Sequence, residues 1–207
     1  MRDESCYDLL ASEARLGSYF AIAKGDLRTR HWFRLGRTVT AVRGGAALIS
    51  WSGSMFEYLM PSLVMRAPSA GLLDQTARLI VERQISYGNE LGIPWGISES
   101  AFNARDIEFT YQYSNFGVPG LGLKRGLSGN TVIAPYATGL AAMVSPCSAA
   151  QNYLRLQREG ARGDDDAGQV PGEVAAGEVD VEAAPRRRRG RVREVLAEGA
   201  QELAAGA

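Results

Sequence analysis

Two glutamates lie in surroundings that favour acid–base chemistry. Glu57 lies in WSGSMFEYLMP, one turn into an expected helix, and Glu99 lies in the loop sequence WGISESAFNARD. A carboxyl group among apolar and aromatic residues is a candidate for the raised pKa that a general acid needs. Two carboxylates that flank one bond are the basic apparatus of glycoside cleavage and transfer. Structural alternatives stay open, because Glu57 could cap its helix or pair with Arg66, and Glu99 could pair with Arg105.

Aromatic side chains in the same stretches would suit a sugar, whose C–H face packs on a ring while its hydroxyls form hydrogen bonds. The candidates for such a wall are Trp51, Trp95, Tyr111, Tyr113 and Tyr136. For each ring taken singly, packing in the core is the competing explanation, but their concentration in loops favours a binding cleft. Asp106 and Glu108 are expected to be structural or to bind sugar hydroxyls.

Other classes of site find little support in the sequence. His31 is the single histidine, and no G-x-S-x-G motif accompanies it, so we expect a hydrogen-bonded structural or rim residue. Cys6 and Cys147 lack the spacing of metal ligands and are expected to be free thiols. No metal or cofactor is therefore expected.

The glycine-rich stretch GVPGLGLKRG, residues 117–126, resembles a phosphate-binding loop only superficially. It does not match G-x-G-x-x-G and lacks the strand-to-helix context of a nucleotide site. We expect a turn-rich loop in which the glycines supply positive φ angles.

The elements that must position these residues are expected to be mainly helical. Apolar spacing, prolines and glycines predict helices over Asp8–Lys24, from Ser54 to a kink or end at Pro61, from Leu72 to about Tyr87, over Pro135–Val144 and over Ser148–Arg158. Only Glu108–Tyr113 alternates as a strand does. The stretches between the helices, at 43–53, 92–107 and 114–133, are expected to be long functional loops.

Composition changes near residue 160. All 17 aromatic residues lie at or before Tyr153, and residues 161–207 use nine residue types with seven arginines and ten acidic residues. Such a segment buries too little apolar surface to offset its ordering entropy, so we expect a disordered tail. Its composition fits out-of-frame translation of a GC-rich gene or a low-complexity extension. Its net negative charge argues against a nucleic-acid partner.

The sequence contains no apolar run long enough to span a bilayer, and its first residues lack the pattern of a signal peptide. From this sequence alone, a cytoplasmic location is expected.

Long motifs resemble one known family. They are DLLASEARLGSYFAIAKGD, HWFRLGR, ALISWSGSMFEYLMPSLVMR, RQISYGNELGIPWGISESAFNARD, YQYSNFGVPGLGLKRGL and VIAPYATGLAAMV, in this order. Together they closely resemble the central glycoamylase-like domain of cyclic β-1,2-glucan synthases, over residues 3–159.

The resemblance implies a mainly α fold that is part of an (α/α)6 toroid of helical hairpins. It also implies transglycosylation on a β-1,2-glucan, within a large parent protein of the bacterial inner membrane. In this family Glu57 and Glu99 lie in acidic motifs, which implies catalytic roles. Residues implied in the wall of the pocket are Trp51, Trp95, Asn103, Arg105 and Tyr136.

The resemblance ends near residue 160, where the family continues into another glutamate-containing motif. Residues 1–160 are therefore expected to be the N-terminal part of the domain, and to be poorly stable and catalytically silent alone. A noncatalytic glucan-binding or scaffolding domain is the alternative.

Overall fold

The computed structural model describes residues 7–105, 111–113, 116–129 and 131–159, and these residues are mainly helical with two small antiparallel sheets. The predicted disordered tail lies outside the described residues. The core gathers residues from α2, α3, α4 and α5 and from the segments between them, and its largest fully buried side chains include Leu48, Met55, Ile80, Ile97 and Phe116. The mainly helical class is confirmed, whereas the toroid stays a prediction.

The first helix is shorter than predicted. Helix α1 spans Ala14–Lys24 and ends at Gly25, which has φ 89°. The predicted start at Asp8 is wrong because residues before Ala14 form a different set of hydrogen bonds. The Gly36 N–H donates to the Asp8 carbonyl at 2.7 Å, and the Leu10 N–H donates to the Gly36 carbonyl at 2.9 Å. This pairing fixes the N-terminal segment against the chain that follows the 3-10 helix η1, Thr29–Arg34.

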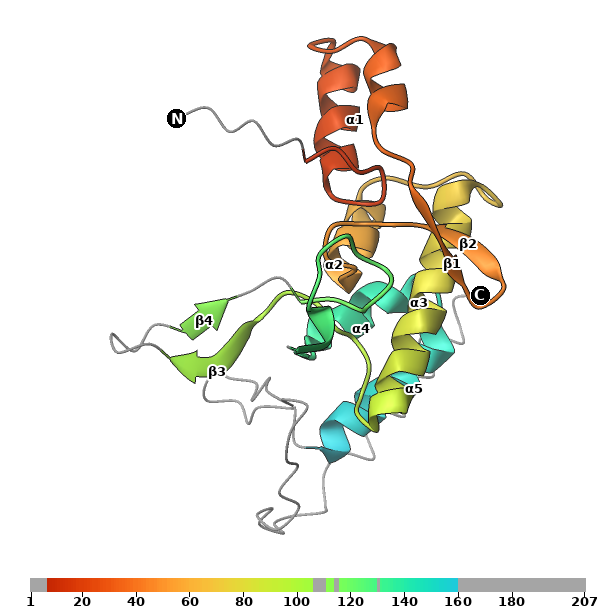
Figure 1. Ribbon diagram of the computed structural model, residues 1–207. Helices are drawn as coiled ribbons and strands as arrows, with labels where there is room; N and C mark the ends of the chain where they lie inside the picture. The colour runs from red at the N-terminus through yellow and green to blue at the C-terminus, as the bar shows by residue number, and fades with distance from the viewer. Residues whose placement is uncertain (1–6, 106–110, 114–115, 130, 160–207) are drawn as a thin grey trace. The chain divides into compact units, whose positions relative to one another are not determined.

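A β-hairpin forms over residues 39–48, and its second strand occupies part of the stretch 43–53 that we expected to be a loop. Strand β1, Val39–Val42, pairs antiparallel with β2, Gly45–Leu48, and the hairpin lies along α3 (Figure 1). The connecting residues Arg43 and Gly44 have φ angles of 45° and 82°. Two positive φ angles are typical of the two-residue turns that join such strands. The alternation of Val39–Val42 was too short for the sequence to distinguish it from a loop.

The helix after Ser54 forms as predicted. Ser54 Oγ accepts a hydrogen bond from the Glu57 N–H at 3.2 Å and so caps helix α2, Met55–Leu59. Beyond it the chain continues as the 3-10 helix η2, Met60–Leu63, which contains Pro61. The proline therefore marks the end of the regular α-helix, because it lacks the N–H that the next turn needs.

The helix predicted from the long apolar stripe is confirmed as α3, Leu72–Leu91. It runs one turn beyond its predicted end at about Tyr87. It buries Thr76, Ile80 and Tyr87, and it ends at Gly92, which has φ 73°. The extra turn includes Gly88, which is buried where a Cβ atom would lie 2.8 Å from the Trp95 side chain, so the helix ends only at Gly92.

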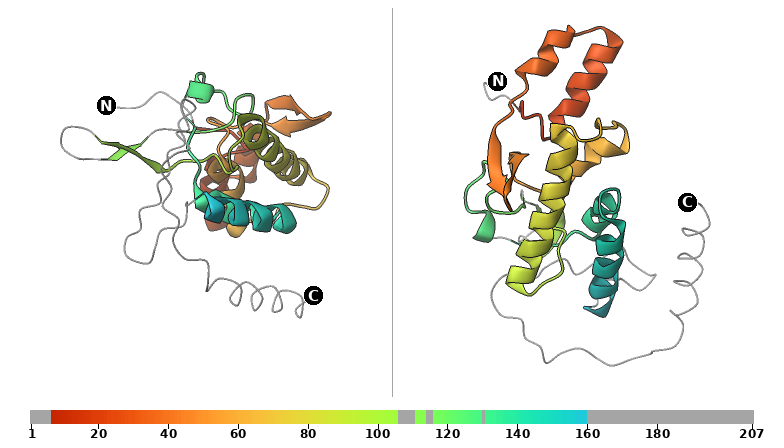
Figure 2. Two further views of the ribbon diagram at one scale, coloured as in Figure 1. Left: turned by 90° about the horizontal axis from the view of Figure 1, so that it is seen from below. Right: turned by 90° about the vertical axis from the view of Figure 1, so that its right-hand side faces the viewer.

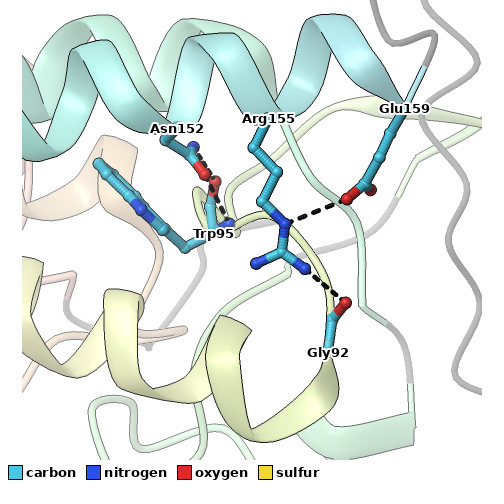
Figure 3. Close-up of polar contacts among 5 residues, drawn as sticks. All are labelled: Gly92, Trp95, Asn152, Arg155 and Glu159. Atoms are coloured by element: carbon cyan, nitrogen blue, oxygen red, sulfur yellow. Dashed lines mark hydrogen bonds and ion pairs between the residues drawn. The ribbon is translucent and has the colours of Figure 1, made fainter.

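Helices α4, Pro135–Ala142, and α5, Pro146–Arg158, form a hairpin whose two members lie side by side (Figure 2). A proline occupies the first turn of each helix, where no N–H partner is lost. Asn152 on α5 joins the hairpin to the loop after α3 (Figure 3). Its side chain donates to the Trp95 carbonyl at 2.7 Å and accepts from the Trp95 N–H at 3.1 Å.

Strands β3, Ala101–Arg105, and β4, Tyr111–Tyr113, pair antiparallel as a second hairpin. The predicted strand Glu108–Tyr113 is confirmed over its described part, and residues 106–110 lie outside the described residues. The prediction that this was the only strand is wrong, since β1, β2 and β3 also form. A short 3-10 helix, η3, covers Leu127–Gly129.

Candidate functional site

The loop before α2 is held in place by close backbone packing. Gly53 has φ 79°, and a Cβ atom added to Gly117 would lie 1.9 Å from the Ser52 carbonyl oxygen. A Cβ atom on Gly122 would lie 2.4 Å from the Ser52 carbonyl carbon. The glycine-rich stretch therefore packs its backbone directly against residues 50–53 and holds them in place. The expectation of positive φ is confirmed at Gly120 and Gly126, but Gly117 and Gly122 are needed for close approach instead.

Glu57 is buried, with 4% of its surface exposed, and its carboxylate receives three hydrogen bonds. Oε2 accepts from the backbone N–H groups of Ser52 at 2.9 Å and Gly53 at 3.1 Å. Oε1 accepts from the Tyr7 hydroxyl at 3.2 Å. No ion pair joins Glu57 to Arg66 within the described residues. Glu57 was a candidate helix cap, but the side chain that caps α2 is that of Ser54. The Glu57 carboxylate instead binds the backbone N–H groups of Ser52 and Gly53, just ahead of the helix.

Glu99 follows the loop that leaves α3 and is only partly buried. Oε1 accepts from the Ser52 hydroxyl at 3.2 Å, and Oε2 accepts from the Ser98 hydroxyl at 3.1 Å. Burial raises the pKa of Glu99, and the negative charge of Glu57 raises it further, while hydroxyl donors oppose the shift.

Ser52 brings the two glutamates together. Its backbone N–H binds Glu57 and its hydroxyl binds Glu99, although 42 positions separate the two acids in the sequence. The two carboxyl groups therefore share one buried serine and differ in their donors. Glu57 is bound mainly by backbone amides, and Glu99 is bound by hydroxyls.

Tyr136 extends this group of hydroxyls. Its hydroxyl lies 2.8 Å from the Glu99 carbonyl oxygen and 3.0 Å from Ser98 Oγ, and its ring meets Phe56 edge to face. Tyr136 is 43% exposed, at the start of α4. Tyr136 is thus a predicted wall residue that forms a hydrogen bond with the Glu99 backbone.

Trp51 lies next to Ser52 and stacks on Tyr7, with ring centroids 5.7 Å apart and planes 13° apart. Sequence reasoning missed Tyr7, which lies 50 residues before Glu57. The signal that could have found it was its place next to the DLLASEARLG motif. The contact itself joins positions 50 apart along the chain, so residue spacing alone does not predict it.

The other predicted wall residues lie elsewhere or cannot be placed. Trp95 is 5% exposed and packs in the hydrophobic core, with its backbone bound to Asn152. Asn103 and Arg105 lie in β3, whose side chains are outside the described part of the structure. Asp106 and Glu108 lie outside the described residues.

Arg15 is a second residue that sequence reasoning missed. This buried side chain on α1 donates to the carbonyls of Glu57 at 3.5 Å and Tyr58 at 2.6 Å. Burial lowers its pKa to about 10, so the guanidinium is still charged at neutral pH. Arg15 therefore fixes α1 to the backbone of α2 at Glu57 and Tyr58.

His31 shares a hydrogen bond of 3.2 Å with Ser18, which joins η1 to α1 and agrees with a structural role. Cys147 is exposed and free, and Cys6 lies outside the described residues. Within the described ranges, no three His, Cys, Asp or Glu side chains come together as metal ligands. In the same ranges no helix is both long and apolar enough to cross a membrane.

Comparison with known proteins identifies the family. The chain is 65% identical, over 161 residues that make up 78% of its length, to the cyclic β-(1,2)-glucan synthase NdvB of Rhizobium meliloti (strain 1021). The chain belongs to the cyclic β-(1,2)-glucan synthase family. It is a short segment of such a synthase, since it spans 6% of the length of this relative. No model of a protein family matches the chain.

Proposed function

We propose that this segment of the synthase acts on β-1,2-linked glucan by glycosyl transfer, with Glu99 as the general acid and Glu57 as its partner carboxylate. The observation that carries the proposal is the shared contact with Ser52, which holds both carboxyl groups at one site. The name of the relative supports a glucan as the substrate. Paired carboxylates are the groups that such a transfer requires.

The assignment of the acid rests on the difference between the two environments. A general acid must hold a proton near neutral pH, and burial together with the Glu57 charge raises the pKa of Glu99. Glu57 accepts two backbone N–H groups and a hydroxyl, which are donors that suit an ionised carboxylate. Where two catalytic carboxyl groups differ in environment, the one with the raised pKa donates the proton and the other stays charged. By this rule Glu99 is the proton donor and Glu57 is the charged partner.

A noncatalytic glucan-binding segment is the second candidate. It is favoured by the contacts of Glu57, because a carboxylate bound to backbone amides at the start of a helix also serves a structural purpose. In that case the aromatic rings bind the glucan and the acids only shape the loop.

Substitution of Glu99 by glutamine distinguishes the two candidates in a full-length synthase that contains this segment. The change keeps the hydrogen-bonding shape and removes the transferable proton. We expect the conversion of linear to cyclic β-1,2-glucan, followed by mass spectrometry, to fall by about 100-fold or more.

The matched control is Glu82→Gln, on the exposed face of α3, which should leave turnover unchanged. Unchanged ring formation by Glu99→Gln, with glucan still bound, would favour the binding segment. The isolated 207-residue chain is proposed to be inactive, so release of cyclic or shortened glucan by it would contradict that part of the proposal.

A further inference from the structure

Tyr7, in the N-terminal segment and outside the two acidic motifs, lies at the site. The bonds between residues 8–10 and Gly36 hold this segment in place. Leu9 and Leu10 next to it are each 5% exposed and therefore anchored in the protein interior. Tyr7 is consequently presented at a fixed position beside Trp51 and Glu57.

The Tyr7 hydroxyl completes the set of donors around Glu57. Backbone amides occupy Oε2, and Tyr7 is the donor to Oε1 at 3.2 Å. With a donor on each oxygen, rotation of the carboxylate is restricted. Burial and the nearby acids Glu13 and Glu57 raise the pKa of Tyr7 well above its usual range, so the phenol keeps its proton.

Tyr7 touches the site and is also exposed to solvent. It stacks on Trp51, yet Tyr7 is 45% exposed whereas Glu57 is 4% exposed. The indole nitrogen of Trp51 is buried and has no acceptor among the described residues. An exposed aromatic surface beside an unsatisfied donor and a carboxylate fits a sugar ring, which offers an apolar face and hydroxyl groups.

We propose that Tyr7 and Trp51 form a stacking subsite for one glucosyl unit of a β-1,2-linked glucan, and that the Tyr7 hydroxyl is a positioning group for Glu57. The inference rests on the proposed function and extends it to a residue that neither the acidic motifs nor the relative's name assigns. Ring and hydroxyl have separate roles, so they can be tested by separate substitutions.

Binding of a linear β-1,2-linked glucose oligomer to the 207-residue chain, measured by isothermal titration calorimetry, tests the stacking role. Tyr7→Ala should raise Kd about tenfold through the lost aromatic contact, and Tyr7→Phe should leave Kd within about twofold. Tyr153→Ala is the matched control, because Tyr153 is 44% exposed and lies on α5. Circular dichroism of each variant verifies that the helices are retained.

The positioning role is tested by Tyr7→Phe in the full-length synthase. We expect kcat to fall by about tenfold with KM unchanged, since the ring is retained and the donor to Glu57 is lost. Tyr153→Phe should change neither.

An unsubstituted chain that is monomeric and retains its helices yet does not bind the oligomer, or a folded Tyr7→Ala chain that binds as well as the control, would overturn the stacking subsite. A Tyr7→Phe synthase with normal kcat would overturn the positioning role. These outcomes are independent of the Glu99→Gln experiment. If the synthase tolerates Glu99→Gln while Tyr7→Ala weakens binding to the 207-residue chain, the acid is refuted and the subsite is kept.

Discussion

At the scale of single residues, the two acids are distinguished by the donors around them rather than by their neighbours in the sequence. Both lie among aromatic residues, but Glu57 is buried against backbone amides whereas Glu99 contacts hydroxyl groups and is partly exposed. A backbone amide donor cannot be removed by changing its side chain, and a hydroxyl donor can. The hydrogen bonds to Glu99 can therefore be altered selectively.

Ser52→Ala should raise the pKa of Glu99 further. The substitution removes the hydroxyl that donates to Oε1 and keeps the backbone N–H that binds Glu57. A hydrogen bond to a carboxylate stabilises its charged form, so its loss favours the protonated form. The measurement is an NMR titration of carboxyl carbons in the 207-residue chain, with the Glu99 signal assigned from the Glu99→Gln variant.

Ser86→Ala serves as the control, since Ser86 lies on α3 and binds Arg83 instead. A lower pKa of Glu99 in Ser52→Ala would contradict the assigned hydrogen bond.

At the scale of elements, the site depends on segments that pack against the loop before α2. The loop residue Ser50 bonds to Leu121 and Leu123, and Trp51 bonds to Lys124, so the glycine-rich stretch runs directly beside the acids. Arg15 holds α1 to the other side of α2. The positions of Glu57 and Ser52 are thus set by two other parts of the chain, the glycine-rich stretch and α1.

Gly117→Ala should destabilise the protein by more than about 2 kcal/mol, because a new Cβ atom would overlap the Ser52 carbonyl and force two backbones apart. Urea unfolding, with tryptophan fluorescence as the probe, measures the free energy of unfolding. Gly129→Ala is the control, since a Cβ atom there has no neighbour within 4 Å. Equal stability of the two variants would show that the close approach of Gly117 to Ser52 is wrong.

At the scale of the whole molecule, large apolar side chains lie uncovered on the part that contains α1, η1 and η2. Phe20 and Phe33 are 68% and 73% exposed, and Leu63 and Val64 are 62% and 69% exposed. A cavity of about 540 Å³ opens between α1, the residues after η2, α3 and the end of α4. Exposed apolar surface of this kind marks an interaction site or favours aggregation.

The isolated chain should therefore self-associate, and Phe20→Ser with Phe33→Ser should reduce that association. Replacing two exposed phenylalanines removes apolar surface without opening the core. Light scattering coupled to gel filtration measures the change in mass, with Leu154→Ser on α5, 41% exposed, as the control. A monomeric unsubstituted chain would show that this surface is tolerated in solution.

The sequence by itself determined the helices whose signals are local. Gly25 ended α1, Pro61 ended the α-helical part after Ser54, and Pro135 began α4, because each acts on its own turn of backbone. The end of α3 was predicted one turn too early, at about Tyr87 instead of Leu91. The same local reasoning identified both acids as candidates, and the long motifs led to the correct family. It failed for the β1–β2 hairpin, where the signal was four residues long.

Only the tertiary structure decided which of these residues meet. Trp95 and Trp51 look alike in the sequence, yet Trp95 packs in the core and Trp51 lies beside Glu57. Tyr7 and Ser52 reach the acids through backbone contacts between distant segments. Such contacts depend on close packing across the fold, and residue types and spacing carry no record of them. The two acids could therefore be chosen from the sequence as candidates, whereas their orientation and their hydrogen-bond donors could not.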